Sequence, residues 1–336
     1  MATIQATKIV APNLWGWLGD RSGRPVYLVR IGAFGGGLCF LGVLLEPGFW
    51  GLLVVMLAFT FFWNAVLPLY EVITLSRLGE DRHRYGQIRL WGSVGFIVAV
   101  GALGALLDLV PLSLFPWLLL PIFAGLIASG WMVEAGKPVA DSQHHARGFW
   151  PALWCGPVLA FLVMSFLLQV SHGAYYTFLS IHLEQHGYDK TAIGLLWSLG
   201  VLAEIAVFLG MHRFLGRFSI RHIALVALGL TLLRWLLIAE ATDSLVVLIF
   251  AQTLHAASYA AMHAISVQFL HQTFKPQHHG QAQALYSGLT FGAGGALGAW
   301  ISGYLVTDFS TSMAFLGSAM AIVIALLVAA LGFRRV

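Results

Sequence analysis

The chain has 336 residues, of which 59% are hydrophobic and only 10% are charged. A soluble domain carries about 25% charged residues, so this composition excludes an ordinary soluble protein and indicates a membrane protein. The formal net charge of +4 reflects where lysine and arginine lie relative to the membrane, and it does not indicate a nucleic-acid partner.

Apolar stretches of about 20 residues, separated by polar residues, predict membrane-spanning helices along the chain. A weak first segment covers residues 1–18, and further segments follow at 26–46, 49–75, 88–110, 112–133, 151–181, 191–213, 219–239, 244–271, 281–305 and 311–332. The longest polar gap, at 134–150, predicts a linker between two halves. We therefore expect an all-α membrane protein with about 11 transmembrane helices. Its parts are an N-terminal bundle over 1–134, a cytoplasmic linker over 135–150 and a C-terminal bundle over 151–336.

The basic residues divide cleanly between the two sets of alternating loops. One set holds Arg21, Arg24, Arg77, Arg82, Arg84, Arg89, Lys137, Arg147, Arg213, Arg217, Arg221, Lys275, Arg334 and Arg335, and the other holds only Lys190. Loops rich in lysine and arginine stay in the cytoplasm. We therefore expect the first set, and with it the C-terminus, to be cytoplasmic.

An internal repeat relates the two halves. YGQIRLWGSVGFIVAVGALG at 85–104 aligns without gaps to HGQAQALYSGLTFGAGGALG at 279–298. The shift of 194 residues also maps the segments at 219–239, 244–271 and 311–332 onto or near predicted helices of the first half. The repeat predicts two parallel six-helix bundles, of which the first lacks its opening helix. Glycines in the two copies would let helices approach closely and rock, namely Gly288, Gly292, Gly294 and Gly298 in one and Gly92 and Gly95 in the other.

The most informative polar residue of the predicted spans is Glu204, near the middle of LLWSLGVLAEIAVFLG at 195–210. A charge at the centre of the bilayer costs about 2.5–3.5 kcal/mol by insertion scales, unless it faces a protein interior and finds a partner. Arg234 and His255 on the next two segments are the candidate partners. The alternative is a buried ion pair that only fixes helix packing.

Helical spacing of about 100° per residue places further polar and aromatic groups on single faces. Such stripes cannot face lipid cheaply, so we expect them to line a central cavity. The stripes are Gln252, His255, Tyr259, His263 and Ser266; Gln169, His172 and Tyr176; Trp197, Gly200 and Glu204; and Asn64, Pro68 and Glu71. For His172 and His263, a satisfied interior histidine is the alternative to a ligand contact.

The sequence GWLGDRSGR at 16–24 resembles the loop motif between helices 2 and 3 of the major facilitator superfamily. The equivalent GMHRFLGRF from Gly210 lacks the aspartate. More narrowly, RYGQIRLWGSVGF, QVSHGAYYTFL, HGYDKTAIGLLWSLGVLAEIAVF and TLHAASYAAMH resemble the phenylpropionate permease branch. The superfamily has twelve helices with both termini cytoplasmic. Helix 1 is missing by comparison, so we expect a mis-assigned gene start or a truncated product.

The resemblance implies a secondary transporter of the bacterial cell inner membrane. We expect proton symport of a small aromatic monocarboxylate such as 3-phenylpropionate, by alternating access and as a monomer. Glu204 would exchange the proton, His255 would relay it or bind substrate, and Arg234, Lys8 or Arg89 would meet the substrate's carboxylate. Trp91, Trp197, Tyr175 and Tyr176 would suit its ring, although packing is the alternative for each.

Two other functions remain open. The order Glu, Arg, His on three successive helices also resembles lactose permease, although Ser258 stands where that family has a further carboxylate. A sugar or nucleoside proton symporter is therefore an alternative. A non-transporting remnant or membrane sensor is another.

In the loop motif, the resemblance implies that Asp20, Arg21, Gly23 and Arg24 form a gating latch. Asp20 would cap a helix and pair with a basic residue such as Arg77 or Arg82. The alternative is a solvated loop that only obeys the positive-inside rule.

No motif indicates an enzyme, a cofactor or a metal ion. The pairs His144-His145 and His278-His279 lack further ligands at metal-binding spacing. Cys39 and Cys155 lie in apolar segments and predict no disulfide framework. The expected partners are a small-molecule substrate, protons and the lipid bilayer.

Overall fold

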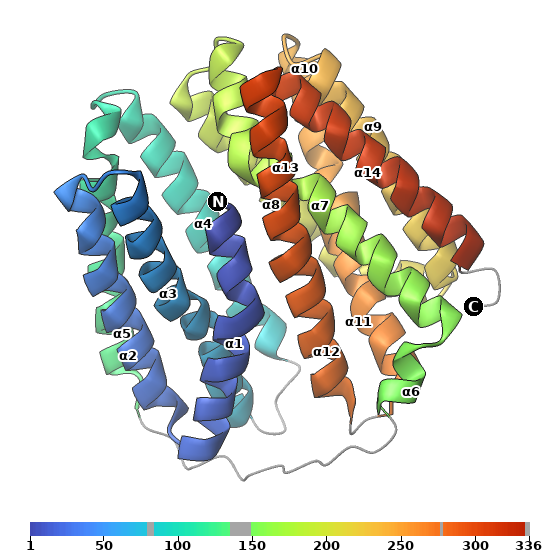
Figure 1. The fold of residues 1–336 in the computed structure, drawn as a ribbon, viewed down its shortest axis with the longest axis horizontal. Coiled ribbons are helices and arrows are strands. Elements are labelled where there is room, and N and C mark those ends of the chain that lie inside the picture. The colour runs from blue at the N-terminus through green and yellow to red at the C-terminus, as the bar shows by residue number, and fades with distance from the viewer. Residues whose placement is uncertain (79–83, 135–148, 276–277, 333–336) are drawn as a thin grey trace. The chain divides into compact units, whose positions relative to one another are not determined.

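The computed structural model describes residues 1–78, 84–134, 149–275 and 278–332. Beyond their place in a helix, nothing is described for six residues within these ranges: Asp20, Leu75, Gly86, Arg89, Trp150 and His212. All regular elements of the described residues are helices, and no strand occurs among them (Figure 1). The prediction of an all-α protein is confirmed.

The helices before residue 135 are α1 (Ala2–Ser22), α2 (Pro25–Phe40), α3 (Phe49–Leu78), α4 (Tyr85–Leu107) and α5 (Phe115–Met132). The helices after residue 148 are α6 (Phe149–Leu153), α7 (Gly156–Gln185), α8 (Lys190–Leu215), α9 (Ile220–Glu240), α10 (Leu245–Thr253), α11 (Met262–Thr273), α12 (His279–Ser287), α13 (Gly295–Asp308) and α14 (Thr311–Gly332). Two π-helical segments, η4 (Ala257–Ala261) and η6 (Gly288–Gly294), lie between α10 and α11 and between α12 and α13.

Local sequence explains where several of these helices begin. The Ser219 hydroxyl accepts a hydrogen bond from the backbone N–H of His222 and caps α9, and Ser244 caps α10 in the same way. Such caps satisfy N–H groups that have no partner within the helix. Proline stands in the first turn of α2 and of α7, where its missing N–H is not needed.

Ten helical stretches of the described residues are long and apolar enough to span a membrane. They agree in order with the segments predicted after residue 25. Helix α1, which covers the weak first segment, forms but is not one of the ten. It carries Gln5, Lys8, Asn13, Asp20 and Arg21, which lower its apolar character.

The described chain divides into two compact units. One comprises 3–92 and 109–143, and the other comprises 1–2, 93–108 and 144–336. The second half of α4 is thus grouped with the helices that follow the polar gap, and we name that larger unit the C-terminal unit. The predicted bundle boundaries at 134 and 151 remain a prediction.

Each unit has its own apolar core. In the C-terminal unit, α14 packs against α7 and α9, and α13 packs against α7. Fully buried side chains such as Phe161, Trp235 and Phe315 fill this core. In the other unit, α2 packs against α3 and α5. Its core includes Ala11, Val29 and Ala65.

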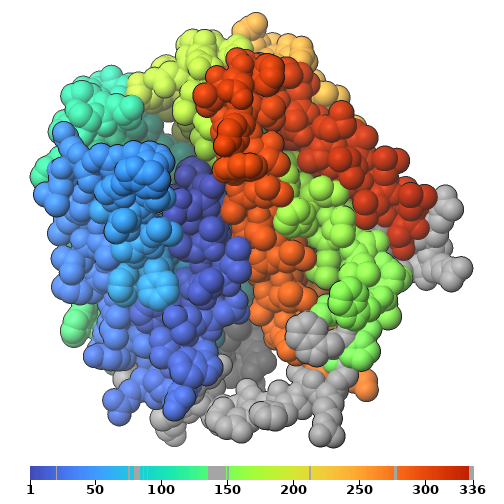
Figure 2. All heavy atoms as spheres, viewed as in Figure 1, coloured from blue at the N-terminus to red at the C-terminus, as the bar shows by residue number. Residues whose placement is uncertain are grey.

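The outer face of α13 and α14 is coloured orange to red in Figure 2. These helices carry large apolar side chains that are exposed, among them Trp300, Tyr304, Met320 and Leu327. An exposed apolar surface of this kind is costly in water but suits a helix that contacts lipid tails.

Candidate functional site

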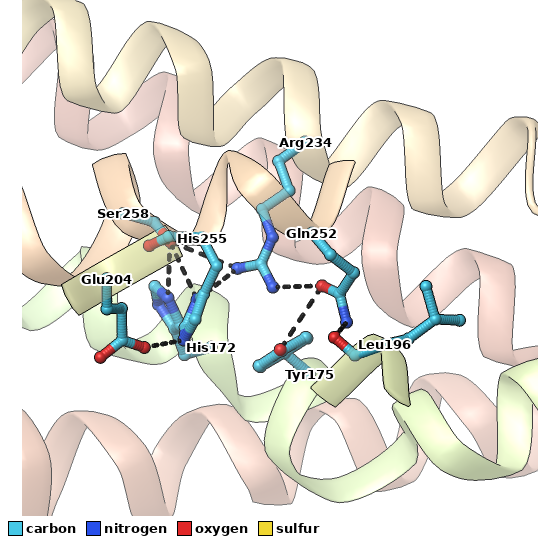
Figure 3. Close-up of polar contacts among 8 residues, drawn as sticks. All are labelled: His172, Tyr175, Leu196, Glu204, Arg234, Gln252, His255 and Ser258. Atoms are coloured by element: carbon cyan, nitrogen blue, oxygen red, sulfur yellow. Dashed lines mark hydrogen bonds and ion pairs between the residues drawn. The ribbon is translucent and has the colours of Figure 1, made fainter. Parts of the chain in front are cut away.

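Three charged or titratable side chains contact one another in series inside the C-terminal unit (Figure 3). Glu204 comes from α8, Arg234 from α9, and His255 from the turn between α10 and η4. The Nε2 atom of His255 lies 2.7 Å from Glu204 Oε1, and its Nδ1 atom lies 3.0 Å from Arg234 Nη1. The structure therefore brings together the three predicted residues, with the imidazole between the carboxylate and the guanidinium.

The donors and acceptors of this chain determine the tautomer of His255. A guanidinium can only donate hydrogen bonds, so Nδ1 of His255 must accept from Arg234. In the neutral ring the proton then resides on Nε2, which donates to Glu204 Oε1. The arrangement is that of an ionised carboxylate and a guanidinium connected by a neutral imidazole. A proton added to Glu204 Oε1 would disrupt this order of hydrogen bonds.

The guanidinium of Arg234 is fully buried and contacted on several sides. Its Nη1 atom donates to Ser258 Oγ at 3.2 Å, and its Nη2 atom donates to Gln252 Oε1 at 3.0 Å. Its Cζ atom lies 4.1 Å from the centre of the Tyr175 ring and 4.5 Å from that of Trp235. Aromatic faces attract a cation and replace part of the hydration that burial removes.

Gln252 connects this cluster to α8 and α7. Its amide nitrogen donates to the carbonyl oxygen of Leu196 at 3.2 Å, and its oxygen also accepts from the Tyr175 hydroxyl at 3.5 Å. The amide thereby has partners for both of its polar atoms inside the bundle, as buried polar groups require.

His172 on α7 approaches the same cluster from the other side. Its Nδ1 atom donates to the carbonyl oxygen of Leu168 at 2.8 Å, which leaves Nε2 as an acceptor 3.4 Å from Ser258 Oγ. Ser258 therefore has both His172 and Arg234 as neighbours. One connected network therefore includes predicted site residues from four helices, namely His172 of α7, Glu204 of α8, Arg234 of α9 and Gln252 of α10.

Two stacks of aromatic rings flank the network. In one, Tyr176 stacks on His172 at 5.7 Å between ring centres and on Trp197 at 6.3 Å. In the other, Tyr259 stacks on His255 at 5.8 Å and on His263 at 6.2 Å. Tyr176, Trp197, Tyr259 and His263 are half-buried, and the Glu204 side chain is 15% exposed. The cluster thus reaches the surface of its unit through a carboxylate and planar rings.

The remaining predicted residues of this unit lie beside these stacks. Gln169 and His263 line a cavity of about 20 Å³. Ser266 is turned to its own helix, because its hydroxyl donates to the carbonyl oxygen of Met262 at 2.7 Å. The Trp197 indole N–H donates to Ser180 Oγ at 3.1 Å.

Several predicted residues lie in the other unit. Asn64 donates to Thr7 Oγ1 at 2.9 Å, and Glu71 accepts from the Tyr85 hydroxyl at 3.0 Å. Trp91 is 74% exposed, and the side chain of Arg89 is outside the described residues. The roles of these residues remain predictions.

The predicted gating loop lies between α1 and α2. Gly23 has a φ of 61°, in the left-handed region that glycine adopts without strain. Arg21 lies over the ring of Trp17 at 5.3 Å, and Arg24 precedes the first turn of α2. The side chain of Asp20 is outside the described residues, so the latch remains a prediction.

Two members of the network carry only a weak signal in the sequence. From the sequence alone, helix packing is enough to explain Tyr175, yet in the structure its ring covers the buried guanidinium of Arg234. Ser258 is conspicuous in the sequence only as a position that lacks a carboxylate, yet it accepts from Arg234. Its spacing does point to the site, since it lies three residues, or about one helical turn, after His255.

A family model described as the MFS_1 like family matches residues 1–317. The probable 3-phenylpropionic acid transporter of Escherichia coli (strain K12) is 28% identical over 277 residues, covering 80% of this chain and 72% of that protein. The maltose permease of Geobacillus stearothermophilus is 26% identical over 335 residues, covering 97% and 83%.

Solved structures show the same fold. The nucleoside transporter NupG superimposes with a TM-score of 0.81 at 17% identity, covering 100% of this chain and 89% of that one. A bacterial homologue of the human lysosomal transporter Spinster, inward-facing and unoccupied, gives a TM-score of 0.63 at 15% identity, covering 99% and 88%. At these identities the likeness concerns the fold alone. The predicted resemblance to the major facilitator superfamily is confirmed.

Proposed function

The chain belongs to the MFS_1 like family and is a multi-pass secondary transporter, and we propose that it carries a small aromatic carboxylate together with protons. The observation that carries this proposal is the Glu204–His255–Arg234 chain, with its 2.7 Å contact between carboxylate and imidazole. It is a titratable pair inside a membrane-spanning bundle, at the edge of a charged network. Intramembrane ionisable residues of this kind mark proton and substrate pathways.

Electrostatics suggests how an anionic substrate and a proton would be coupled. Two carboxylates cannot both stay ionised at close range in a site of low dielectric constant. A substrate carboxylate that approaches the exposed edge of Glu204 therefore favours protonation of Glu204. Loss of the substrate on the opposite side of the membrane lets the proton leave. Substrate and proton then move in the same direction.

The aromatic part of the proposal is supported by the two ring stacks. Trp197 and Tyr176 stack on each other and form one planar edge, and Tyr259, stacked on the His255 ring that contacts Glu204, forms another. A phenyl ring adds to such edges by offset or edge-to-face contact. The name of the phenylpropionic acid transporter relative agrees with a substrate of this class.

A second candidate is a sugar or nucleoside proton symporter. It is favoured by the maltose permease relative and by the nucleoside transporter fold. Gln252, His172 and Ser258 have hydrogen-bonding groups of the kind such substrates need. In this structure, however, His172 contacts Ser258, and Gln252 is hydrogen-bonded to Arg234 and Leu196.

We further propose that the protein lies in the bacterial inner membrane as a monomer, with a cytoplasmic C-terminus. The orientation is supported by the gathering of basic residues in one set of loops.

The test is transport by the purified protein in proteoliposomes with an imposed pH gradient. We expect labelled 3-phenylpropionate to accumulate when the outside is acidic, and a protonophore to abolish the accumulation. Unlabelled maltose or uridine should not compete. Proton-driven uptake of labelled maltose or uridine, with no uptake of phenylpropionate, would favour the second candidate.

The matched variants are Glu204→Gln and Glu240→Gln. Glutamine at 204 imitates the protonated carboxyl, so exchange of internal for external substrate should continue while gradient-driven accumulation is lost. Glu240 is exposed at the end of α9, and its variant should behave as the wild type. Normal proton-driven accumulation by Glu204→Gln would remove Glu204 from the coupling mechanism.

A further inference from the structure

A small cavity inside the C-terminal unit adjoins the hydrogen-bonded network at Ser258. It has a volume of about 20 Å³ and lies between α7, the η4–α11 segment and the α12–η6 segment. Its polar lining includes Ser165, Gln169, Ser258, Tyr259, His263 and Thr290. A cavity needs roughly 10–15 Å³ of such volume to hold one water molecule, and a water also needs two to four polar partners. This cavity meets both conditions.

Ser165 supplies an independent reason to expect an occupant. Its side chain is only 3% exposed, and its hydroxyl has no hydrogen-bond partner among the described residues. A buried hydroxyl without a partner is unfavourable, and native proteins satisfy such groups with protein atoms or ordered water. Ser165 lines the cavity, so a water there could be its partner.

The two π-helical segments also meet at this cavity. Ser258 and Tyr259 belong to η4, and Thr290 and Phe291 belong to η6. Short π-helical segments are rare and occur frequently at functional sites. Thr290 donates to the carbonyl oxygen of Tyr286 at 2.6 Å, so its hydroxyl oxygen can still accept a hydrogen bond from an occupant.

Ser258 connects the cavity to the charged network. Its hydroxyl oxygen lies 3.4 Å from His255 Nδ1, on the ring whose other nitrogen contacts Glu204 (Figure 3). His263, on α11, also lines the cavity. An oxygen placed between Ser258 and His263 would complete a continuous series of hydrogen-bonding groups.

We propose that this cavity holds one ordered water molecule that satisfies Ser165 and extends the Glu204–His255–Ser258 chain to His263 as a route for the transported proton. The route rests on the proposed proton coupling, whereas the bound water does not. In this structure Nδ1 of His255 accepts from Arg234, and the Ser258 hydroxyl donates to the carbonyl oxygen of His255 at 3.0 Å, so the route requires both hydrogen bonds to be released first. Ser258 then takes a proton from the water and passes its own proton to Nδ1, while Nε2 releases its proton to Glu204. O–H and N–H bonds are exchanged one for one, and no electron is transferred.

The water itself is tested by X-ray hydroxyl-radical footprinting of the purified protein with mass spectrometry, since radicals formed from buried ordered water label adjacent side chains. We expect Tyr259 and Tyr286 to be labelled as fast as exposed tyrosines, despite the burial of Tyr286. Labelling at the slow rate of the core residue Phe315 would show a dry cavity and overturn the proposal. Loss of labelling on addition of substrate would assign the cavity to the substrate, which also overturns it.

The route is tested with variants of Ser165. Ser165→Thr adds a methyl group that fills the cavity and keeps the hydroxyl, and Ser165→Ala removes the hydroxyl and keeps the space. Ser318 on α14 is a matched control, because it is equally buried and its hydroxyl donates to Ala314 at 3.0 Å. In proteoliposomes, substrate-driven proton uptake should fall at least tenfold in Ser165→Thr. Substrate exchange should stay within twofold of the wild type.

The Ser318→Thr control should leave both rates unchanged. Unchanged proton uptake in Ser165→Thr, with footprinting that shows the water gone, would overturn the route. If Ser165→Thr does not fold, Ser165→Ala must show slowed labelling of Tyr259, or the assignment of the water fails. Failure of the proposed coupling is recognised separately, because Glu204→Gln would then accumulate substrate normally while the footprint of the water persists.

Discussion

At the scale of single residues, the site contains two opposite charges, on Glu204 and Arg234, that are connected through the His255 imidazole. Arg234 and Glu204 each contact His255, and Arg234 also contacts Ser258 and Gln252. Taking such charges out of water is costly, and hydrogen bonds and the opposite charge offset that cost. Both Nη atoms of Arg234 have partners, whereas its buried Nε atom has none among the described residues. Removal of one charge leaves the other buried without its counter-charge. A single substitution of Arg234 should therefore lower the free energy of unfolding more than the substitution of Arg234 and Glu204 together.

We therefore predict that Arg234→Met lowers the free energy of unfolding by about 3–5 kcal/mol, because Glu204 and His255 lose the cation that compensates them. The measurement is unfolding in detergent followed by tryptophan fluorescence. Arg221→Met is the control, because Arg221 makes one hydrogen bond to the carbonyl oxygen of Ala330. It should cost about 1 kcal/mol.

The double variant Glu204→Gln with Arg234→Met should recover part of the lost stability, since it removes both charges. A coupling of about 0.5–3 kcal/mol is expected for groups in one network. Strict additivity of the two single effects would show that Arg234 and Glu204 do not stabilise each other.

At the scale of elements, glycines mark the closest helix contacts. A Cβ atom at Gly298 of α13 would overlap the backbone of Val170 in α7. The residue that the repeat aligns with it is Gly104 of α4, where a Cβ atom would lie 2.5 Å from the carbonyl oxygen of Lys190. Both copies of the repeat thus use the same position for a close approach. The sequence interpretation of Gly298 as a packing position agrees with this contact, whereas the predicted positions Gly288 and Gly95 have nothing within 4 Å of an added Cβ atom.

Gly298→Ala should therefore destabilise the protein by about 1–3 kcal/mol, the usual cost of overpacking, since the opposing atoms are backbone and cannot rotate away. Gly303→Ala on the same helix is the matched control, because nothing lies within 4 Å of its added Cβ. Unfolding midpoints in detergent compare the two. Equal midpoints would contradict the close approach of α13 to α7.

The end of α4 meets the start of α8 through Asp108. Its carboxylate accepts from the backbone N–H groups of Lys190 and Thr191, both at 2.9 Å, and from the Thr191 hydroxyl at 2.5 Å. The pKa of Asp108 is lowered, chiefly by the hydrogen bond from the Thr191 hydroxyl. The two backbone N–H donors and the charge of Lys190 lower it further, whereas partial desolvation opposes the shift. Such a cap favours the ionised form at a helix N-terminus.

A lowered pKa means that the folded state favours ionised Asp108. The cap should therefore stabilise the protein fully above the ordinary carboxyl pKa of about 4, and the effect should be lost as the pH falls through the lower folded value. We predict that Asp108→Ala lowers the unfolding midpoint equally at pH 6 and pH 8. The difference from the wild type should shrink below pH 4. A difference that grew on acidification would contradict this assignment.

At the scale of the whole molecule, the arrangement of charge determines the expected orientation. Of the lysine and arginine residues in the predicted loops, all but Lys190 lie in one of the two sets of loops. Lys190 lies in the other set, where its Nζ atom is 3.6 Å from Glu184 Oε1. The potential difference and the insertion machinery retain basic loops in the cytoplasm. The two sets of loops should therefore lie on opposite sides of the membrane.

We predict that green fluorescent protein fused after Val336 is fluorescent in bacterial cells, and that alkaline phosphatase fused there is inactive. The matched control is a fusion after Asp243, in the turn between α9 and α10, where the two reporters should behave in the opposite way. The same reporter result at both positions would contradict the orientation.

Composition and periodicity alone determined the fold class and the order of the ten apolar spans, because lipid permits few backbone solutions and each helix satisfies its own hydrogen bonds. The family was indicated by the resemblance of particular sequence motifs, such as GWLGDRSGR at 16–24. Composition and periodicity also identified Glu204, Arg234 and His255, since charges are rare enough in apolar segments to be conspicuous. Only the tertiary structure decided that the imidazole lies between the two charges, that Tyr175 covers the guanidinium and that a cavity adjoins Ser165. Those facts depend on how α7, α8, α9 and the π-helical segments pack, and distances between helices are not encoded in the period of any one of them.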